Sequence, residues 1–418
     1  MARTTPDAVV IGAGHNGLVA ANVLADAGWS VVVHEAEEEP GGAVRSGELV
    51  EPGFVHDRYS SFFPLGAASP VFRRLGLAIP WRHGPLVLAH PGLDGSVAVL
   101  DRDAAGTTMG PDWPTLVAAW ERIEPAVLRG MTTPFPQLGA AARIALEPRA
   151  IALLRRPDDP LARRLLTGNA LHTDAPASSF TGHALGLLLT AFGQRHGYPC
   201  VAGGSRRIVD LLVERARARG VELRLGERLD RIPTARRAVL AAVDVWELGR
   251  LTGRTARTEP DPAVVKLDWT LDGPVPWTVE AARRAPVVHL GDERFFVLFG
   301  QYSPADPERA PPGKETAWAY SRLPADPGDV EAVIERHAPG FGVLVRGRRV
   351  EKLPPGRVNL GTAKARNELV LRGRLGRPET GVPGVYLASA SAHPGGGVHG
   401  APGWIAAQAA LRAARRRG

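Results

Sequence analysis

Over residues 7–35 the apolar positions fall into two short runs with a stretch of helical spacing between them. Residues 9–11 form a short apolar run that predicts a buried strand, and a glycine-rich turn follows. Apolar positions at helical spacing then run from Leu18 to Ala25, with Gly28 suited to the residue after a helix. Residues 31–33 predict a second buried strand. The pattern therefore predicts a strand–helix–strand unit.

Three glycines and one acid in this unit have the spacing of a dinucleotide-binding fingerprint. Gly12 would make the tight turn, Gly14 would leave room for a pyrophosphate, and Gly17 would let the helix approach the strand. Glu35 ends the second strand, where a carboxylate favours an unphosphorylated ribose. This leaves NAD or the ADP half of FAD. The residues expected to contact the cofactor here are Gly12, Gly14, His15, Asn16, Gly17 and Glu35.

Two further glycine-rich segments favour FAD, the longer of the two cofactors. Gly41 and Gly42 permit close backbone approach, and Arg45 offers a planar cation to phosphate or flavin oxygens. Residues 384–390 predict a strand that leads into a glycine loop and an alanine-rich helix, whose first amides would stabilise negative charge on a reduced flavin. The loop residues expected to line the flavin are Gly395, Gly396, Gly397, Val398 and His399.

The segments 8–18, 40–46, 54–57 and 386–401 together resemble the phytoene desaturase-like flavoproteins, which include carotenoid desaturases, carotenoid isomerases and retinol saturases. The resemblance implies an α/β fold: a discontinuous, glutathione-reductase-type FAD-binding Rossmann domain with an inserted α+β substrate domain. It also implies that the backbone of Leu229 contacts the adenine. The chain departs from the family in its short connection after Ile232, in Arg206, which replaces a glycine, and in Trp404 at the last helix.

This resemblance divides the chain into two domains. Residues 1–75, 195–250 and 355–418 would form the FAD-binding domain, and residues 76–194 and 251–354 the substrate domain. Apolar strands expected at 287–290 and 295–302 belong either to a core or to an apolar pocket. Stretches rich in proline and glycine, such as residues 303–313, are expected at the surface.

Four residues are candidates for moving a proton: His399, Asp57 and His56 in the segments that resemble the family, and Lys266 in residues 264–277, which resemble a substrate-domain strand of the same family. Each also has a structural interpretation, as part of a turn, an ion pair or a solvated strand. The 12 histidines show no metal-ligand spacing, so we expect no metal. The hard step of the reaction would belong to the flavin.

Composition narrows the function classes. A single cysteine excludes an internal disulfide and a redox-active dithiol. The net charge of +8 comes from 47 arginines and 4 lysines spread along the chain, so we do not expect nucleic acid binding. The longest apolar stretch is far below spanning length, and we expect a cytoplasmic protein. The arginines at 412 and 415–417 allow peripheral contact with anionic lipid.

The favoured function is an FAD-dependent desaturase or oxidase acting on an apolar or conjugated small molecule, with oxygen or a quinone as electron acceptor. Alternatives are a flavin-requiring isomerase or saturase of the same fold, or an FAD-binding protein without turnover. An NAD-dependent dehydrogenase fits the terminal motif less well. The sequence leaves the oligomeric state open.

Overall fold

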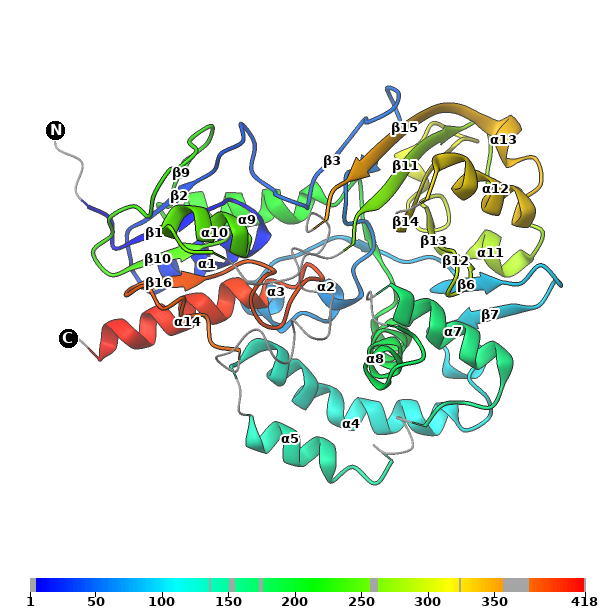
Figure 1. The fold of residues 1–418 in the computed structure, drawn as a ribbon, viewed down its shortest axis with the longest axis horizontal. Coiled ribbons are helices and arrows are strands. Elements are labelled where there is room, and N and C mark those ends of the chain that lie inside the picture. Colours follow the sequence, from blue (N-terminus) through cyan, green and yellow to red (C-terminus); the bar gives the residue numbers. More distant parts are fainter. Residues whose placement is uncertain are drawn as a thin grey trace.

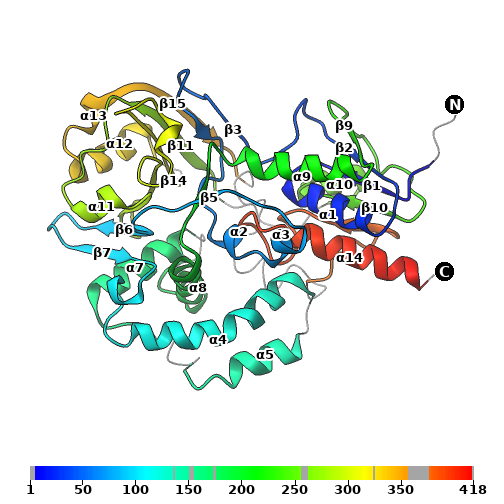
Figure 2. The same cartoon turned by 180° about the vertical axis from the view of Figure 1, so that it is seen from behind.

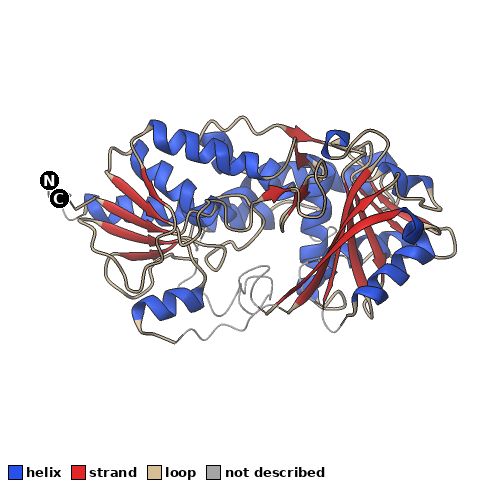
Figure 3. Cartoon of the chain, turned by 90° about the horizontal axis from the view of Figure 1, so that it is seen from above, coloured by secondary structure: helices blue, strands red, loops and turns tan. Residues whose placement is uncertain are grey.

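The computed structural model describes residues 5–134, 137–149, 155–172, 176–255, 262–322, 325–355 and 376–416. Two β-sheets lie at opposite ends of the molecule, with helices packed between and around them (Figure 1). The view from above separates the two sheets most clearly (Figure 3). Two parts of the third predicted FAD-binding segment, 355–418, lie outside the described residues. They are residues 356–375 and the C-terminal residues from Arg417.

The first sheet has five parallel strands in the order β16-β10-β1-β2-β9. These strands come from three separated stretches of chain: β1 (Ala8–Ile11) and β2 (Val31–His34), β9 (Glu222–Arg224) and β10 (Ala238–Ala241), and β16 (Val385–Leu387). One face packs against α1 (His15–Asp26), α9 (Arg206–Ala218) and α14 (Ala401–Arg415), and the other against α10 (Val245–Thr252). The predicted strand–helix–strand unit is present at residues 8–34.

The second sheet is mixed and has seven strands in the order β15-β11-β14-β13-β12-β6-β7. Among the described strands of this sheet, β12 and β6 are the one parallel pair. Its strands are β6 (Leu88–Pro91), β7 (Val97–Leu100), β11 (Val264–Leu271), β12 (Val287–Gly291), β13 (Phe296–Gln301), β14 (Glu315–Arg322) and β15 (Val345–Leu353). Small two-stranded sheets pair β3 (Ser46–Gly47) with β4 (His56–Asp57), and β5 (Trp81–Arg82) with β8 (Cys200–Val201).

The remaining helices surround the larger sheet and fill the middle of the molecule (Figure 2). They are α2 (Pro64–Ala68), α3 (Pro70–Arg74), α4 (Trp113–Thr132), α5 (Leu138–Ala145), α7 (Pro160–Leu171), α8 (Phe180–His196), α11 (Glu280–Arg284), α12 (Pro327–His337) and α13 (Phe341–Leu344), with 3-10 turns η1 (Ala104–Gly106) and η2 (Pro307–Arg309). Within the described ranges, every helix is too short or too polar to cross a lipid bilayer.

The two faces of the larger sheet have different chemistry. On the outer face Trp269 packs edge-on against Phe341 of α13, and its indole N–H donates to Glu331 of α12. Lys266 and Asp268 alternate with these apolar positions and therefore point to the other, inner face. Cross-strand pairing places Lys266 opposite Tyr320 on this inner face. Titratable and aromatic side chains thus gather there.

Candidate cofactor and substrate site

The three glycines of the turn after β1 are required for different reasons. Gly12 has a φ of +95°, and a Cβ there would lie 2.9 Å from the carbonyl oxygen of Ala242. A Cβ at Gly17 would lie 2.1 Å from the carbonyl oxygen of Gly12. Gly14 has an ordinary φ of −65°, and a Cβ there would have the Cα of Gly42 as its nearest neighbour, 3.9 Å away. The fold itself therefore does not need glycine at 14, and the open space suits a bound pyrophosphate.

Glu35 lies beside this turn and is almost fully buried. One carboxylate oxygen accepts the backbone N–H of Ala13 at 2.7 Å, and the other accepts that of Glu37 at 3.0 Å. The carbonyl of Glu35 accepts the N–H of Glu227, which brings the segment leading to Leu229 to the same edge of the sheet. The carbonyl of Leu229 already accepts a hydrogen bond from Arg250. The predicted contact of Leu229 with adenine would therefore use its backbone N–H, and it stays a prediction.

Arg45 has an incompletely bonded guanidinium. One terminal nitrogen donates to the carbonyl of Glu39 at 3.1 Å, but its Nε is buried without a hydrogen-bond partner among the described residues. The Oδ1 atom of Asn16 at the start of α1 is in the same state. Buried polar atoms without partners are costly, so both atoms fit contacts to a bound ligand. Arg206, which replaces a family glycine, pairs instead with Glu39.

The C-terminal glycine loop holds His399 through both ring nitrogens. The N–H of Ala401 donates to Nδ1 at 3.1 Å, so Nε2 carries the proton and donates to the carbonyl of Gly396 at 3.1 Å. Burial, with a smaller effect of His393, lowers the pKa of His399 to about 4. The imidazole is therefore neutral and fully bonded. Its contacts favour a brace for the loop over the base that we considered from sequence.

The same loop is strained and lies at the start of α1. Within the described residues Val398 is the one non-glycine residue with a positive φ, at 51°, and it is buried. Gly395 and Gly397 beside it have φ values of 115° and 116°. Burial, and then the nearby His399, lowers the pKa of His15 to about 3. The first and last cofactor motifs of the chain therefore meet, and strain of this kind is common where a backbone clamps a ligand.

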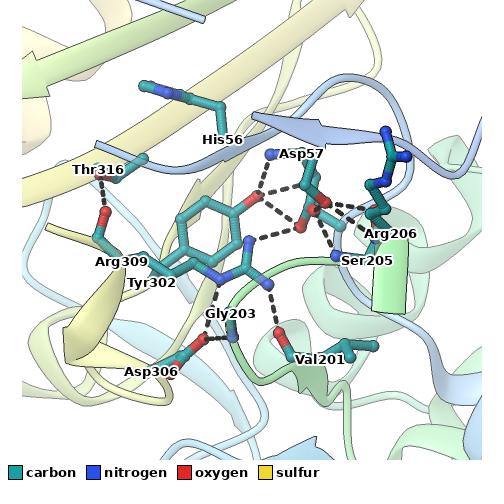
Figure 4. A network of polar contacts seen from close by, with 12 residues as sticks. His56, Asp57, Val201, Gly203, Ser205, Arg206, Tyr302, Asp306, Arg309 and Thr316 are labelled. Atoms are coloured by element: carbon teal, nitrogen blue, oxygen red, sulfur yellow. Dashed lines mark hydrogen bonds and ion pairs between the residues drawn. The ribbon is translucent and has the colours of Figure 1, made fainter. Parts of the chain in front are cut away.

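Asp57 is the centre of a second cluster, where the FAD-binding domain meets the larger sheet (Figure 4). Its Oδ1 accepts hydrogen bonds from Ser46 Oγ at 2.7 Å and the N–H of Ser205 at 2.8 Å. Its Oδ2 accepts from Arg309 at 2.7 Å and from the hydroxyl of Tyr302 at 3.0 Å. Burial alone would raise the pKa of Asp57, but Arg309 and these hydrogen bonds lower it below its usual value. Such a saturated carboxylate is suited to holding structure rather than to accepting a proton.

His56 and Lys266 lie beside this cluster, where β4 approaches β11. Both ring nitrogens of His56 face carbonyl oxygens, of Phe54 at 3.2 Å and Trp269 at 3.1 Å. The Nζ atom of Lys266 is ion-paired with Asp268 and lies 3.4 Å from the carbonyl oxygen of Asp57. Burial lowers the pKa of both side chains. Of the four proton-transfer candidates, Lys266 is the one on the inner face of the larger sheet.

Arg309 is the principal residue that sequence reasoning missed. It lies in the proline- and glycine-rich stretch 303–313, which we expected at the surface, and that expectation was wrong at this residue because Arg309 is 1% exposed. Its partner Asp57 is 252 residues away in the chain. No local pattern signals such a contact; the only sequence clue was the apolar strand that ends at Tyr302.

Comparisons with known proteins agree with this geometry. Residues 10–75 match the model of an NAD(P)-binding Rossmann-like domain. A limonene dehydrogenase subunit of Castellaniella defragrans is 34% identical over 28% of this chain and 20% of its own length. Polyamine oxidase 3 of Oryza sativa is 27% identical over 61% of this chain and 54% of its own length. A solved putrescine oxidase structure aligns with a TM-score of 0.62 at 16% identity, covering 98% of this chain and 99% of that one.

These similarities support an FAD-dependent oxidoreductase. Its predicted fold class, a glutathione-reductase-type FAD-binding Rossmann domain with an additional domain, is confirmed. The protein is an enzyme, and its cofactor is FAD. The aligned regions cover about a fifth and about half of the two named relatives, so their reactions do not transfer directly to this oxidoreductase. The phytoene desaturase-like subfamily stays a prediction.

Proposed function

We propose that this oxidoreductase is a desaturase or oxidase that acts on a C–H bond of an apolar or conjugated small molecule. The observation that carries the proposal is a row of aromatic rings on the inner face of the larger sheet. The ring of Phe62 lies 5.7 Å from that of Tyr302 and 6.1 Å from that of Trp318. The rings of Trp318 and Tyr320 are parallel within 2°. Tyr302 and Trp318 are buried, while Phe62 and Tyr320 are partly buried beside them, and aromatic side chains of this kind line sites for apolar and planar molecules.

The charges beside these rings favour an uncharged substrate. Asp57 is paired with Arg309, and Asp268 with both Lys266 and Arg349. Neither Asp57 nor Asp268 is therefore left to balance a cationic amine. The Nζ atom of Lys266 lies 5.8 Å from the centre of the Trp318 ring. The similarity to the limonene dehydrogenase subunit supports an apolar substrate as well.

Bound FAD supplies the hydride acceptor, flavin N5, and oxygen or a quinone would reoxidise it. The chain's own residues hold the cofactor and place the substrate. The open space at Gly14, the Nε of Arg45 and the carboxylate of Glu35 would hold the phosphates and ribose. Where a proton also leaves the substrate, we assign the neutral amine form of Lys266, which burial favours by lowering its pKa, to take that proton at Nζ. The aromatic rings exclude water from the reacting carbon.

Two other functions stay open to test. The polyamine and putrescine oxidase similarities favour oxidation of an amine, and the family resemblance also includes isomerases and saturases. Anaerobic mixing of the purified FAD-loaded enzyme with limonene, a long polyene or putrescine separates them. We expect an apolar compound to bleach the flavin and to lose two hydrogens by mass spectrometry. Bleaching by putrescine alone, or a product of unchanged mass, would contradict the proposal.

A further inference from the structure

Arg309 joins two parts of the molecule that are distant in sequence. Its Nη1 bonds to Asp57, its Nη2 donates to the carbonyl of Val201 at 2.6 Å, and its Nε donates to Asp306 at 3.0 Å. The guanidinium also stacks on the ring of Tyr302, 4.0 Å from its centre. All three nitrogens are therefore used (Figure 4). A lysine has a single nitrogen and cannot make this set of contacts.

The carboxylate of Asp57 passes this constraint to the cofactor side. Its other oxygen accepts from Ser46, which directly follows Arg45 in the chain. The carbonyl of Arg45 accepts the N–H of Arg58, directly after Asp57, at 2.8 Å. The backbone on the C-terminal side of Arg45 is thus held to residues 57 and 58. The unpartnered, buried Nε of Arg45 is then held at a fixed place.

We infer that Arg309 is a positioning residue for FAD: acting through Asp57 and Ser46, it fixes Arg45 in the orientation that binds the cofactor. This inference rests on the cofactor assignment within the proposed function. Its physical basis is that a guanidinium on one carboxylate oxygen keeps the anion ionised and oriented, so that the other oxygen stays in place to accept from Ser46. Arg309 itself contacts Asp57, Val201, Asp306 and Tyr302, so it acts on the cofactor only through its neighbours.

The test is a double-mutant cycle on FAD affinity, measured by titrating apoprotein with FAD and following flavin fluorescence. We expect Arg309→Lys and Arg45→Gln each to weaken FAD binding about tenfold, the loss typical of a charge-assisted hydrogen bond. The double variant should be no more than about threefold weaker than Arg45→Gln, because the two residues act in one series. Effects that multiply would overturn the inference.

Controls separate positioning from general stability. Arg215→Lys removes contacts of another partly buried arginine, which pairs with Asp26, and should leave FAD affinity unchanged. If Arg309→Lys does not fold, Tyr302→Phe replaces it, because this change keeps the ring and removes one donor from Asp57. We expect Tyr302→Phe to weaken FAD binding about threefold, as for one neutral hydrogen bond, and unchanged affinity would overturn the inference. Wild-type apoprotein that binds no FAD would instead refute the cofactor assignment.

Discussion

Glu35 accepts the backbone N–H of Ala13 at 2.7 Å, so the end of β2 is tied to the glycine turn that follows β1. This bond joins the residue expected at the ribose to the turn expected at the pyrophosphate. The two halves of the adenosine site therefore have a fixed separation before any cofactor binds. Pre-organisation of this kind reduces the entropy that binding costs.

Substitution of Glu35 tests this connection. Glu35→Ala should weaken FAD binding about tenfold, because it removes the acceptor for Ala13 together with the ribose contact. Glu35→Gln should have a smaller effect, since its amide oxygen still accepts the N–H of Ala13. Equilibrium titration with FAD measures both. Equal losses in the two variants would show that charge, rather than the tie to Ala13, determines affinity.

Gly14→Val should abolish FAD retention while the protein remains folded. The Cβ would have the Cα of Gly42, 3.9 Å away, as its nearest neighbour from a distant part of the chain, so we expect a loss of about 1 kcal/mol of stability or less, as at a helix N-cap. Gly17→Val is the contrasting variant, because its Cβ would clash with the Gly12 carbonyl and unfold the domain. Cofactor release and thermal melting distinguish them. A Gly14→Val protein that copurifies with full FAD would refute the fingerprint assignment.

Asp57 should make stability depend on acid pH. Its folded pKa lies below the usual value of 3.8, so its stabilising contribution is complete above that pH and is lost as the pH falls through the folded pKa. Asp57→Asn should cost about 3 kcal/mol near neutrality, as expected for a broken buried ion pair. The difference between wild type and variant should shrink below the ordinary pKa. Urea unfolding at a series of pH values measures it, and a constant difference would contradict the assigned ion pair.

Lys266→Met should slow flavin reduction by the substrate at least about a hundredfold if Nζ takes a proton, since general bases contribute factors of that order. FAD binding should change little, because Lys266 bonds to Asp268 and to the backbone carbonyl of Asp57, and not to the Asp57 carboxylate that holds Ser46. Rapid-mixing spectroscopy under anaerobic conditions gives the rate. Lys266→Arg is the control, because it keeps a positive charge at this position. A normal rate in Lys266→Met would show that Lys266 takes no proton in the reaction.

The pH dependence of the reaction rate should show no ionisation of His399. Its pKa near 4 and its two occupied ring nitrogens make it neutral throughout the range from about pH 5.5 to 9. We expect His399→Gln to loosen the glycine loop and weaken FAD retention, with the shape of the rate profile unchanged. A limb that disappears in this variant would restore His399 as a base.

The parts of the fold that depend on neighbours in sequence were predictable. Residues 8–35 contain a complete strand, turn and helix, so the spacing of Gly12, Gly14 and Gly17 and the position of Glu35 fixed the interpretation. The strands at 287–291 and 296–301 also follow from their apolar runs. Each of these signals lies within one element.

The cluster around Asp57 was beyond that kind of reasoning. Asp57 was a candidate base because it lies in a segment that resembles the family, whereas the fold brings Arg309 and Ser205 to it from 252 and 148 residues away. The segment around Arg309 has the proline and glycine content of an exposed loop. Arg309 is buried because it contacts Asp57 and Val201, which come from distant parts of the chain. Local composition cannot predict such contacts.

The position of β16 has a consequence for how the enzyme is made. β10 stays an edge strand until residues 385–387 are synthesised, and the flavin loop and α14 come later still. A nascent chain on the ribosome therefore cannot form the complete cofactor cradle, although its first strand–helix–strand unit emerges early. Capture of FAD must wait until residues 385–401 have been translated, and the parallel strands that are already made need protection from aggregation until then.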